Sequence, residues 1–391
     1  DPIEIGSLAQ CSRYLSTLIA DQHLWRELYL SQPLDDPTKC VSPMGRPHPE
    51  PFDWKGELQT ITRARTVLED ISLCKPHERC GVLQTLLRLV SWVPPLRYPS
   101  DDDNVSLNIL WVSAFTRRGN FIDSRSIPWE QSDEEKQLRA KLHTMLGLIP
   151  SDLDKEVVMG SRAFVYTMRN YNWANEFGPF NGNGTVNWVH VKAIHHAISM
   201  HLIPPIPEGT DFEMLLYPLS APHTQVVLPE GVDLDKVEDW AGVGGIWYLS
   251  FCFVDHRQLI RYNQSGLGPQ GLLDNAHISD PDFREIYRTL EVKVHVARTA
   301  PDKKHPGRPQ IYFVGVMAAP STSIMNGYVK MMDDGQIRWH FVCGESGNAI
   351  WSCEGVQIGG VQSAYGGSWT TIFHDADDPV GKYRAIRQYK G

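Results

Sequence analysis

Four histidines lie close together in the stretch HVKAIHHAISMH, at His190, His195, His196 and His201. Imidazole nitrogens are common zinc ligands, so the stretch is a candidate metal site. On a helix, His190 and His201 would lie about three turns apart on one face, with His195 and His196 elsewhere. Ligand pairs on a helix need spacings of i, i+3 or i, i+4, and the HExxH pattern is absent. We therefore expect interior or surface histidines and predict no metal site.

Cys252 lies close to Asp255 and His256 in the sequence, an arrangement that could supply a thiol nucleophile with a nearby base. The apolar residues around Cys252 are typical of a strand, and side chains three or four positions apart on a strand do not converge on one point. The G-x-S-x-G pattern of a serine nucleophile is also absent. The sequence therefore predicts no catalytic residue, and we expect a protein that is not an enzyme.

Two further stretches have the composition of a phosphate-binding or calcium-binding loop but lack the sequence pattern of such a loop. GVGG, at residues 242–245, precedes a segment with strand character, whereas a phosphate loop follows a strand and begins a helix. HDADDP offers the carboxylates of Asp375, Asp377 and Asp378 beside His374, but it lacks the glycine and the terminal glutamate of a calcium loop. We predict a turn for the first stretch, a solvated hairpin loop for the second, and no cofactor.

The composition limits the kind of protein that these residues belong to. The 391 residues carry a formal net charge of −9, and 42% of them are hydrophobic, which is typical of a globular chain with roughly two or three domains. The negative charge and the lack of a basic stripe argue against nucleic-acid binding, and the longest apolar runs are too short to cross a membrane. Seven cysteines without a C-x-x-C pair indicate reduced thiols in the cytoplasm or the nucleus.

The first half of the chain has helical patterns separated by proline-rich segments. Residues 1–30 indicate three short helices, and residues 33–51 hold so many prolines that we expect a linker or an extended crossover there. Apolar residues at helical spacing then predict helices over about 53–70, 77–93, 133–148 and 186–202.

From about residue 244 the pattern becomes one of alternating strands. Residues 290–296 place Leu and Val on one face, and residues 337–341 alternate Ile, Trp and Phe with Arg and His. An Asp-Gly turn at 334–335 predicts a hairpin. The count of about eight or nine short strands is typical of a closed up-and-down barrel or of a β-sandwich.

The predicted fold class is therefore α+β, with an all-α N-terminal part followed by an all-β domain. We place the boundaries at 1–32 for the opening helices, 33–207 for a helical region, 208–235 for a linker and 236–391 for the β-domain.

A short motif favours the barrel. Gly245, Ile246 and Trp247 form a G-x-W at the start of the first strand, and the last strand carries Arg384 and Arg387. This pattern resembles that of the calycins, the lipocalins and their relatives. The resemblance implies that Trp247 packs beneath an arginine of the last strand and closes one end of the barrel, a cation–π arrangement.

The opening thirty residues resemble an F-box from its second helix onward. The matching positions are Asp1-Pro2, Leu8-Ala9, Cys11-Ser12-Arg13, Asp21, Leu24-Trp25-Arg26 and Leu28. Much of the remaining chain, including the stretches over 161–202 and 335–370, is similar to a group of fungal F-box proteins.

The resemblance implies a substrate receptor of a Skp–cullin–F-box ubiquitin ligase, in the ubiquitin-conjugation pathway. Its F-box would dock on the Skp adaptor, and through it on a cullin, while the β-domain would hold an unknown protein substrate. The residues that this implies for adaptor binding or for the F-box core are Pro2, Ile5, Leu8, Leu15, Leu24 and Trp25. The family's first helix would precede Asp1, so we expect a fragment of the F-box with reduced adaptor affinity. The alternative function is that of a calycin-like protein that binds a small molecule in its barrel.

Overall fold

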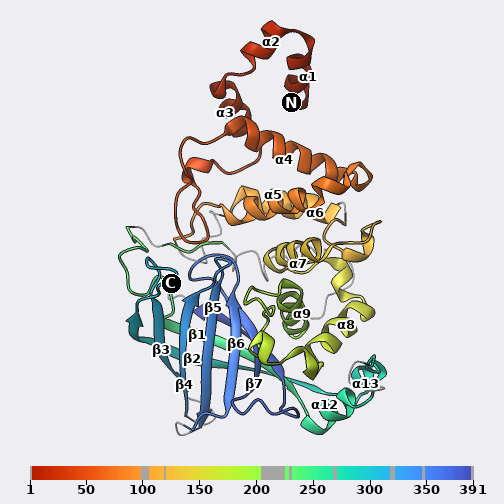
Figure 1. Ribbon diagram of the computed structural model, residues 1–391, viewed down its shortest axis with the longest axis vertical. Helices are drawn as coiled ribbons and strands as arrows, with labels where there is room; N and C mark the ends of the chain where they lie inside the picture. Colours follow the sequence, from red (N-terminus) through yellow and green to blue (C-terminus); the bar gives the residue numbers. More distant parts are fainter. Residues whose placement is uncertain are drawn as a thin grey trace.

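The computed structural model has a series of helices followed by a closed β-barrel (Figure 1). It describes residues 2–97, 105–118, 120–203, 225–228, 231–266, 271–317, 322–345 and 348–388. Most of the linker predicted over 208–235 lies outside these residues. The predicted fold class, helices first and then a closed barrel, is confirmed.

Three short helices form an N-terminal arm: α1 (Pro2–Cys11), α2 (Arg13–Leu18) and α3 (Gln22–Leu30). Ser12 caps α2 by accepting a hydrogen bond from the Leu15 amide at 3.1 Å, and Asp21 caps α3 through the His23 amide at 2.9 Å. In Figure 1, α1 and α2 lie at the end of the molecule farthest from the barrel. The three helices predicted for residues 1–30 are therefore present.

A helical body follows the arm. The predicted crossover at 33–51 runs beside it and pairs Val41 with Val93 in an isolated bridge. All four predicted helices are present, and the structure adds α6 and α8, which the sequence patterns did not indicate. The body comprises α4 (Trp54–Glu69), α5 (Arg79–Ser91), α6 (Leu107–Arg118), α7 (Asp133–Leu146), α8 (Lys155–Tyr166) and α9 (Trp188–Ser199).

Eight antiparallel strands form the barrel, each paired with its neighbours in sequence, and β1 also pairs with β8. A sheet that closes in this way has no free edge, so the β-sandwich alternative is wrong. The strands are β1 (Gly245–Val254), β2 (Glu285–Ala300), β3 (Gln310–Met317), β4 (Ser323–Met331), β5 (Ile337–Glu345), β6 (Trp351–Gln357), β7 (Tyr365–Thr371) and β8 (Gly381–Gln388).

The alternation predicted along the strands is present. In β2, Val292 and Val294 are buried between exposed neighbours, and in β5, Trp339 and Phe341 belong to the barrel core. Gly335 adopts a left-handed φ of 73° in the hairpin between β4 and β5, as the Asp-Gly turn predicts.

Two short helices interrupt the segment that we predicted to be all-β. They are α12 (His256–Asn263) and α13 (Ala276–Ser279), and they lie between β1 and β2. The Asp255 side chain accepts a hydrogen bond from the Arg257 amide at 3.0 Å and so caps α12. The strand containing Cys252 therefore ends at Val254, and placing Asp255 and His256 on that strand was wrong.

The helical body and the barrel share a hydrophobic core. Val356 of β6 and Ile358 just after it are buried in the same cluster as the side chains of α4, α5 and α7. Helices α8 and α9 contact the outside of β8, and α9 also contacts β7. The helices thus cover one outer face of the barrel.

Candidate functional site

One end of the barrel is filled by aromatic rings. Trp339 and Tyr365 stack with ring centroids 3.9 Å apart, and Trp247 meets both rings edge-on. The indole N–H of Trp247 donates to the carbonyl oxygen of Val243 at 2.9 Å. All three rings are buried, so this end of the barrel is a packed core with no room for a ligand.

The two arginines predicted for barrel closure lie on opposite faces of β8. Arg387 is paired with Trp247 in the register of β1 and β8, and its guanidinium donates to the Gly244 carbonyl at 2.6 Å. It therefore lies at the closed end, where the calycin resemblance predicts an arginine. Arg384 is paired with Ser250 and faces outward beneath α9, beside His195. Arg384 does not take part in barrel closure, because strand residues three apart point to opposite faces.

The other end of the barrel holds a cavity of about 580 Å³. Aromatic, aliphatic and sulfur-containing side chains line most of it, and its size falls in the range of small-molecule sites. Its lining consists of Leu249, Phe251, Phe253, Leu290, Met317, Ser323, Phe341, Cys343, Gly344, Glu345, Ile350, Trp351, Cys353, Trp369 and Tyr383.

Few polar groups face this cavity. The buried hydroxyl of Tyr383 has no hydrogen-bond partner among the described residues. Ser323 already donates to the carbonyl oxygen of Gly344 at 2.7 Å. Burial raises the pKa of the Cys353 thiol, so this sulfur is protonated and behaves as an apolar group. The cavity is therefore suited to an apolar or aromatic ligand.

The residues predicted to bind an adaptor differ in exposure. Trp25 is buried in the core that the arm shares with the helical body, and its indole N–H donates to the Ile19 carbonyl at 2.6 Å. Pro2 is buried as well. Ile5, Leu15 and Leu24 are half-buried, and Leu8 is exposed.

The arm also exposes large apolar side chains that the sequence pattern did not single out. Ile3, Tyr14 and Leu18, together with Leu8, are between 48% and 73% exposed. Ile3 and Leu8 belong to α1, and Tyr14 and Leu18 belong to α2, two helices that contact each other. Exposed apolar side chains in neighbouring elements are a feature of surfaces that bind another molecule, so these two helices are a candidate docking site.

The four clustered histidines lie in separate surroundings. His190 contacts the Tyr171 hydroxyl at 3.1 Å, and His196 contacts the backbone carbonyl of Asp152 at 2.9 Å. Burial lowers the pKa of His195 to about 3, so it is neutral. His201 contacts the carboxylate of Glu285, a residue far from these histidines in sequence, at 3.0 Å. His190 and His196 are buried, whereas His195 and His201 are half-buried.

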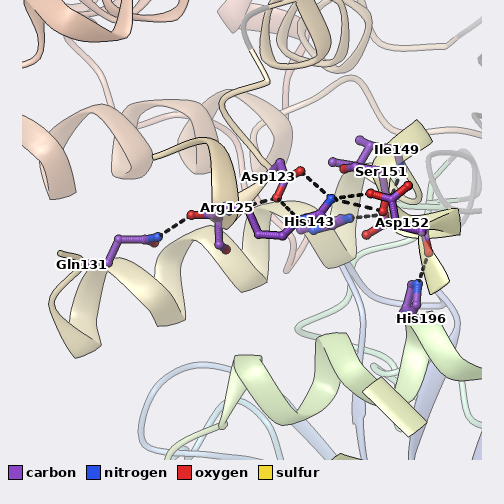
Figure 2. Close-up of polar contacts among 10 residues, drawn as sticks. Asp123, Arg125, Gln131, His143, Ile149, Ser151, Asp152 and His196 are labelled. Atoms are coloured by element: carbon purple, nitrogen blue, oxygen red, sulfur yellow. Dashed lines mark hydrogen bonds and ion pairs between the residues drawn. The ribbon is translucent and has the colours of Figure 1, made fainter. Parts of the chain in front are cut away.

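A buried His–Asp pair lies within the helical body (Figure 2). The imidazole of His143 in α7 is 2.7 Å from the Asp152 carboxylate, which also accepts a hydrogen bond from the Ile149 amide at 2.9 Å. Burial alone would raise the pKa of Asp152, but the adjacent His143 lowers it well below its ordinary value. With His196 on the Asp152 carbonyl, the pair ties α7 to α9.

A second buried cluster joins the helical body to the barrel through the carboxylate of Glu285 in β2. The ammonium group of Lys382 in β8, which is 0% exposed, contacts one carboxylate oxygen, and the Tyr166 hydroxyl of α8 donates to the same oxygen. His201 lies 3.0 Å and Arg162 3.5 Å from the other oxygen. Burial would raise the pKa of Glu285, but Lys382 and these hydrogen bonds hold it well below its ordinary value.

The same cluster brings possible metal donors together. One atom each of His201, Cys252 and Glu285 lie within 4.8 Å of one another. However, Lys382 and Arg162 already neutralise the carboxylate, and a divalent ion would add charge to a buried site that is already positive. Burial also raises the pKa of Cys252 to about 12, so the sulfur is a thiol and a poor ligand. The donor set does not fit a metal ion.

The two loops with ligand-like composition have the structures that we predicted for them. Gly242 turns with a left-handed φ of 72°, and the Asp239 carboxylate accepts hydrogen bonds from the amides of Val243 and Gly244, at 2.6 and 2.8 Å. HDADDP lies in the loop between β7 and β8.

Comparisons of the chain with protein-family models, with curated proteins and with solved structures find no match. Within the part of the chain that the structure describes, no helix has the length and apolar character needed to span a membrane.

Proposed function

We propose that this chain is a substrate-receptor subunit of a Skp–cullin–F-box ubiquitin ligase, which would act in the cytoplasm or the nucleus. The observation that supports it best is the exposure of Ile3, Leu8, Tyr14 and Leu18 on the N-terminal arm. The arm has three short helices, as the residue pattern of 1–30 predicts.

The predicted contact residues fall into two groups. Leu8 would enter the adaptor interface directly, and the half-buried Ile5, Leu15 and Leu24 would line its edge. Trp25 would hold the arm in shape from within, because its ring and its N–H group are already satisfied inside the chain.

The barrel would hold the protein substrate. The arm lies at one end of the molecule and the barrel at the other (Figure 1). A receptor built in this way performs no bond chemistry, and it acts by raising the effective concentration of substrate lysines near the charged conjugating enzyme.

Co-purification of the chain with the Skp adaptor tests the proposal. We expect Leu8→Glu and Leu18→Glu to weaken adaptor binding by roughly tenfold or more, because each places a charge in an apolar interface. Gln10→Glu, at an exposed polar position of α1, is the matched control and should bind normally. A wild-type chain that fails to bind the adaptor would show the proposal to be wrong.

The barrel cavity supports a second candidate function, the binding of a small apolar ligand. A cavity of about 580 Å³ with a largely apolar lining remains in the barrel although its closed end is packed. Titration with N-phenyl-1-naphthylamine should give saturable fluorescence. Leu290→Trp, which fills the cavity, should abolish it, while Tyr248→Trp on the outer face of β1 should leave it unchanged. An equal response from both variants would refute this function.

A further inference from the structure

A second hollow lies outside the barrel, between the turn at 172–177 and the loop that joins β7 to β8. Its volume is about 250 Å³. Its lining includes Trp173 and Phe177 from the turn, and His374, Asp375 and Asp378 from the loop. We call this hollow the aromatic groove.

Three aromatic rings pack against one another in the aromatic groove. Phe177 and His374 stack with centroids 3.9 Å apart and an interplanar angle of 13°. Trp173 stands nearly perpendicular to both, at 5.0 and 5.3 Å. Phe177 and His374 both have left-handed backbone conformations, with φ of 59° and 56°, which direct the two rings toward each other. Trp173 is 74% exposed, so a large indole surface faces solvent.

The charges that line the aromatic groove are negative. The Asp378 carboxylate accepts hydrogen bonds from the Thr371 hydroxyl and from the Asp375 amide, the latter at 2.9 Å. These contacts fix the loop and leave the Asp375 carboxylate without a side-chain partner among the described residues. Burial lowers the pKa of His374, so its ring is neutral and does not repel a cation.

We propose that the aromatic groove binds the cationic side chain of a lysine or an arginine in a protein substrate, an inference that rests on the proposed receptor function. The negative faces of aromatic rings attract ammonium and guanidinium groups, and the carboxylate of Asp375 supplies the complementary charge. An uncharged apolar side chain gains nothing from that carboxylate.

The experiment uses short peptides as probes and the indole N–H signal of Trp173 as the readout. Acetylated, amidated pentapeptides carry lysine, arginine or trimethyl-lysine at the centre of four glycines, and a norleucine peptide of the same length lacks the charge. The Trp173 signal is assigned by its loss in Trp173→Phe. We expect a saturable shift with the cationic peptides and a much smaller one with norleucine.

Two pairs of variants separate the aromatic groove from its surroundings. Trp173→Ala should weaken binding by roughly three- to fivefold, whereas Phe373→Ala, at an exposed ring outside the groove lining, should have no effect. Asp375→Asn should weaken it by roughly twofold at low salt, whereas Asp377→Asn, outside the lining, should not. Binding to these four is followed through the shifts of the groove backbone amides.

An equal response to norleucine, or no saturable shift with any cationic peptide, overturns the proposal. Adaptor binding is measured separately on the same preparations. If the chain binds the adaptor but no cationic peptide, only the groove proposal fails. If it binds the peptides but not the adaptor, only the receptor function fails.

Discussion

Replacing Glu285 with glutamine removes the negative charge that the helical body and the barrel share. The carboxylate is 5% exposed and contacts Lys382 from β8, Tyr166 from α8, and His201 and Arg162 from the covering helices and the segment after them. Removing one partner of a buried ion pair costs about 3–5 kcal/mol, because the other charge stays buried without compensation. Lys382 is completely buried, so we expect Glu285→Gln to lower the free energy of unfolding by about 4 kcal/mol.

Substitution of the partner, Lys382, should lower the free energy of unfolding by less. In Lys382→Met the Glu285 carboxylate keeps His201 at 3.0 Å and Arg162 at 3.5 Å, so its charge is still compensated in part. We expect a loss of about 2–3 kcal/mol. In the double variant neither charge is left alone, so its loss should be smaller than the sum of the single losses by about 2 kcal/mol.

The same group predicts a pH dependence. In the folded chain the pKa of Glu285 lies well below its ordinary value. In the unfolded chain it is about 4.3. The unfolded state therefore binds the proton first as the pH falls. The stabilisation from Glu285 is complete above the unfolded pKa and declines as the pH drops below about 5. Glu285→Gln should lose this part of the acid destabilisation.

Urea unfolding followed by far-ultraviolet circular dichroism measures all of these values. Glu291→Gln, at an exposed position of the same strand, is the matched control and should leave the unfolding free energy within about 0.5 kcal/mol of the wild type. Strict additivity of the two single losses would refute the argument, since it would mean that Glu285 and Lys382 do not interact.

Three smaller substitutions test other parts of the structure. Trp25→Phe removes the N–H group that donates to Ile19, and it should cost the arm about 1 kcal/mol, measured by hydrogen exchange of the first three helices. Tyr383→Phe removes a buried hydroxyl without a partner among the described residues, and it should raise the unfolding free energy by about 1 kcal/mol in urea. Gly367→Ala would place a Cβ 1.9 Å from the backbone oxygen of Glu354, so we expect a loss of about 3 kcal/mol and a lower melting temperature.

The local parts of the fold could be predicted because each depends on residues near in sequence. The alternation around Val292 and Trp339 determines which face of the strand is buried, and the Asp-Gly pair before Gln336 determines the hairpin. Helix α12 was missed because its residues directly follow a long apolar run, and only the cap at Asp255 marks where that strand ends.

The sites could be predicted only in part, because they depend on register and on distant contacts. The register pairs Arg387 with Trp247 at the closed end of the barrel, and the same register places Arg384 on the opposite face of β8. The cluster around Glu285 collects residues from α8, β1, β2 and β8 and from the end of the helical body, so no sequence spacing reveals it. Cys252 stood out beside His256 in the sequence, but the imidazole that approaches it is that of His201.

The helical body separates the arm from the barrel cavity and the aromatic groove. The cavity and the aromatic groove lie at the barrel end where β1 leads into α12, and in Figure 1 that end points away from the arm. The helical body lies between the arm and the barrel. It packs on the arm through the core that contains Trp25, and on the barrel through Val356 and the Glu285 cluster. Buried side chains make these described contacts. A receptor of the proposed kind would need a fixed distance between arm and groove to present substrate lysines repeatedly at one place.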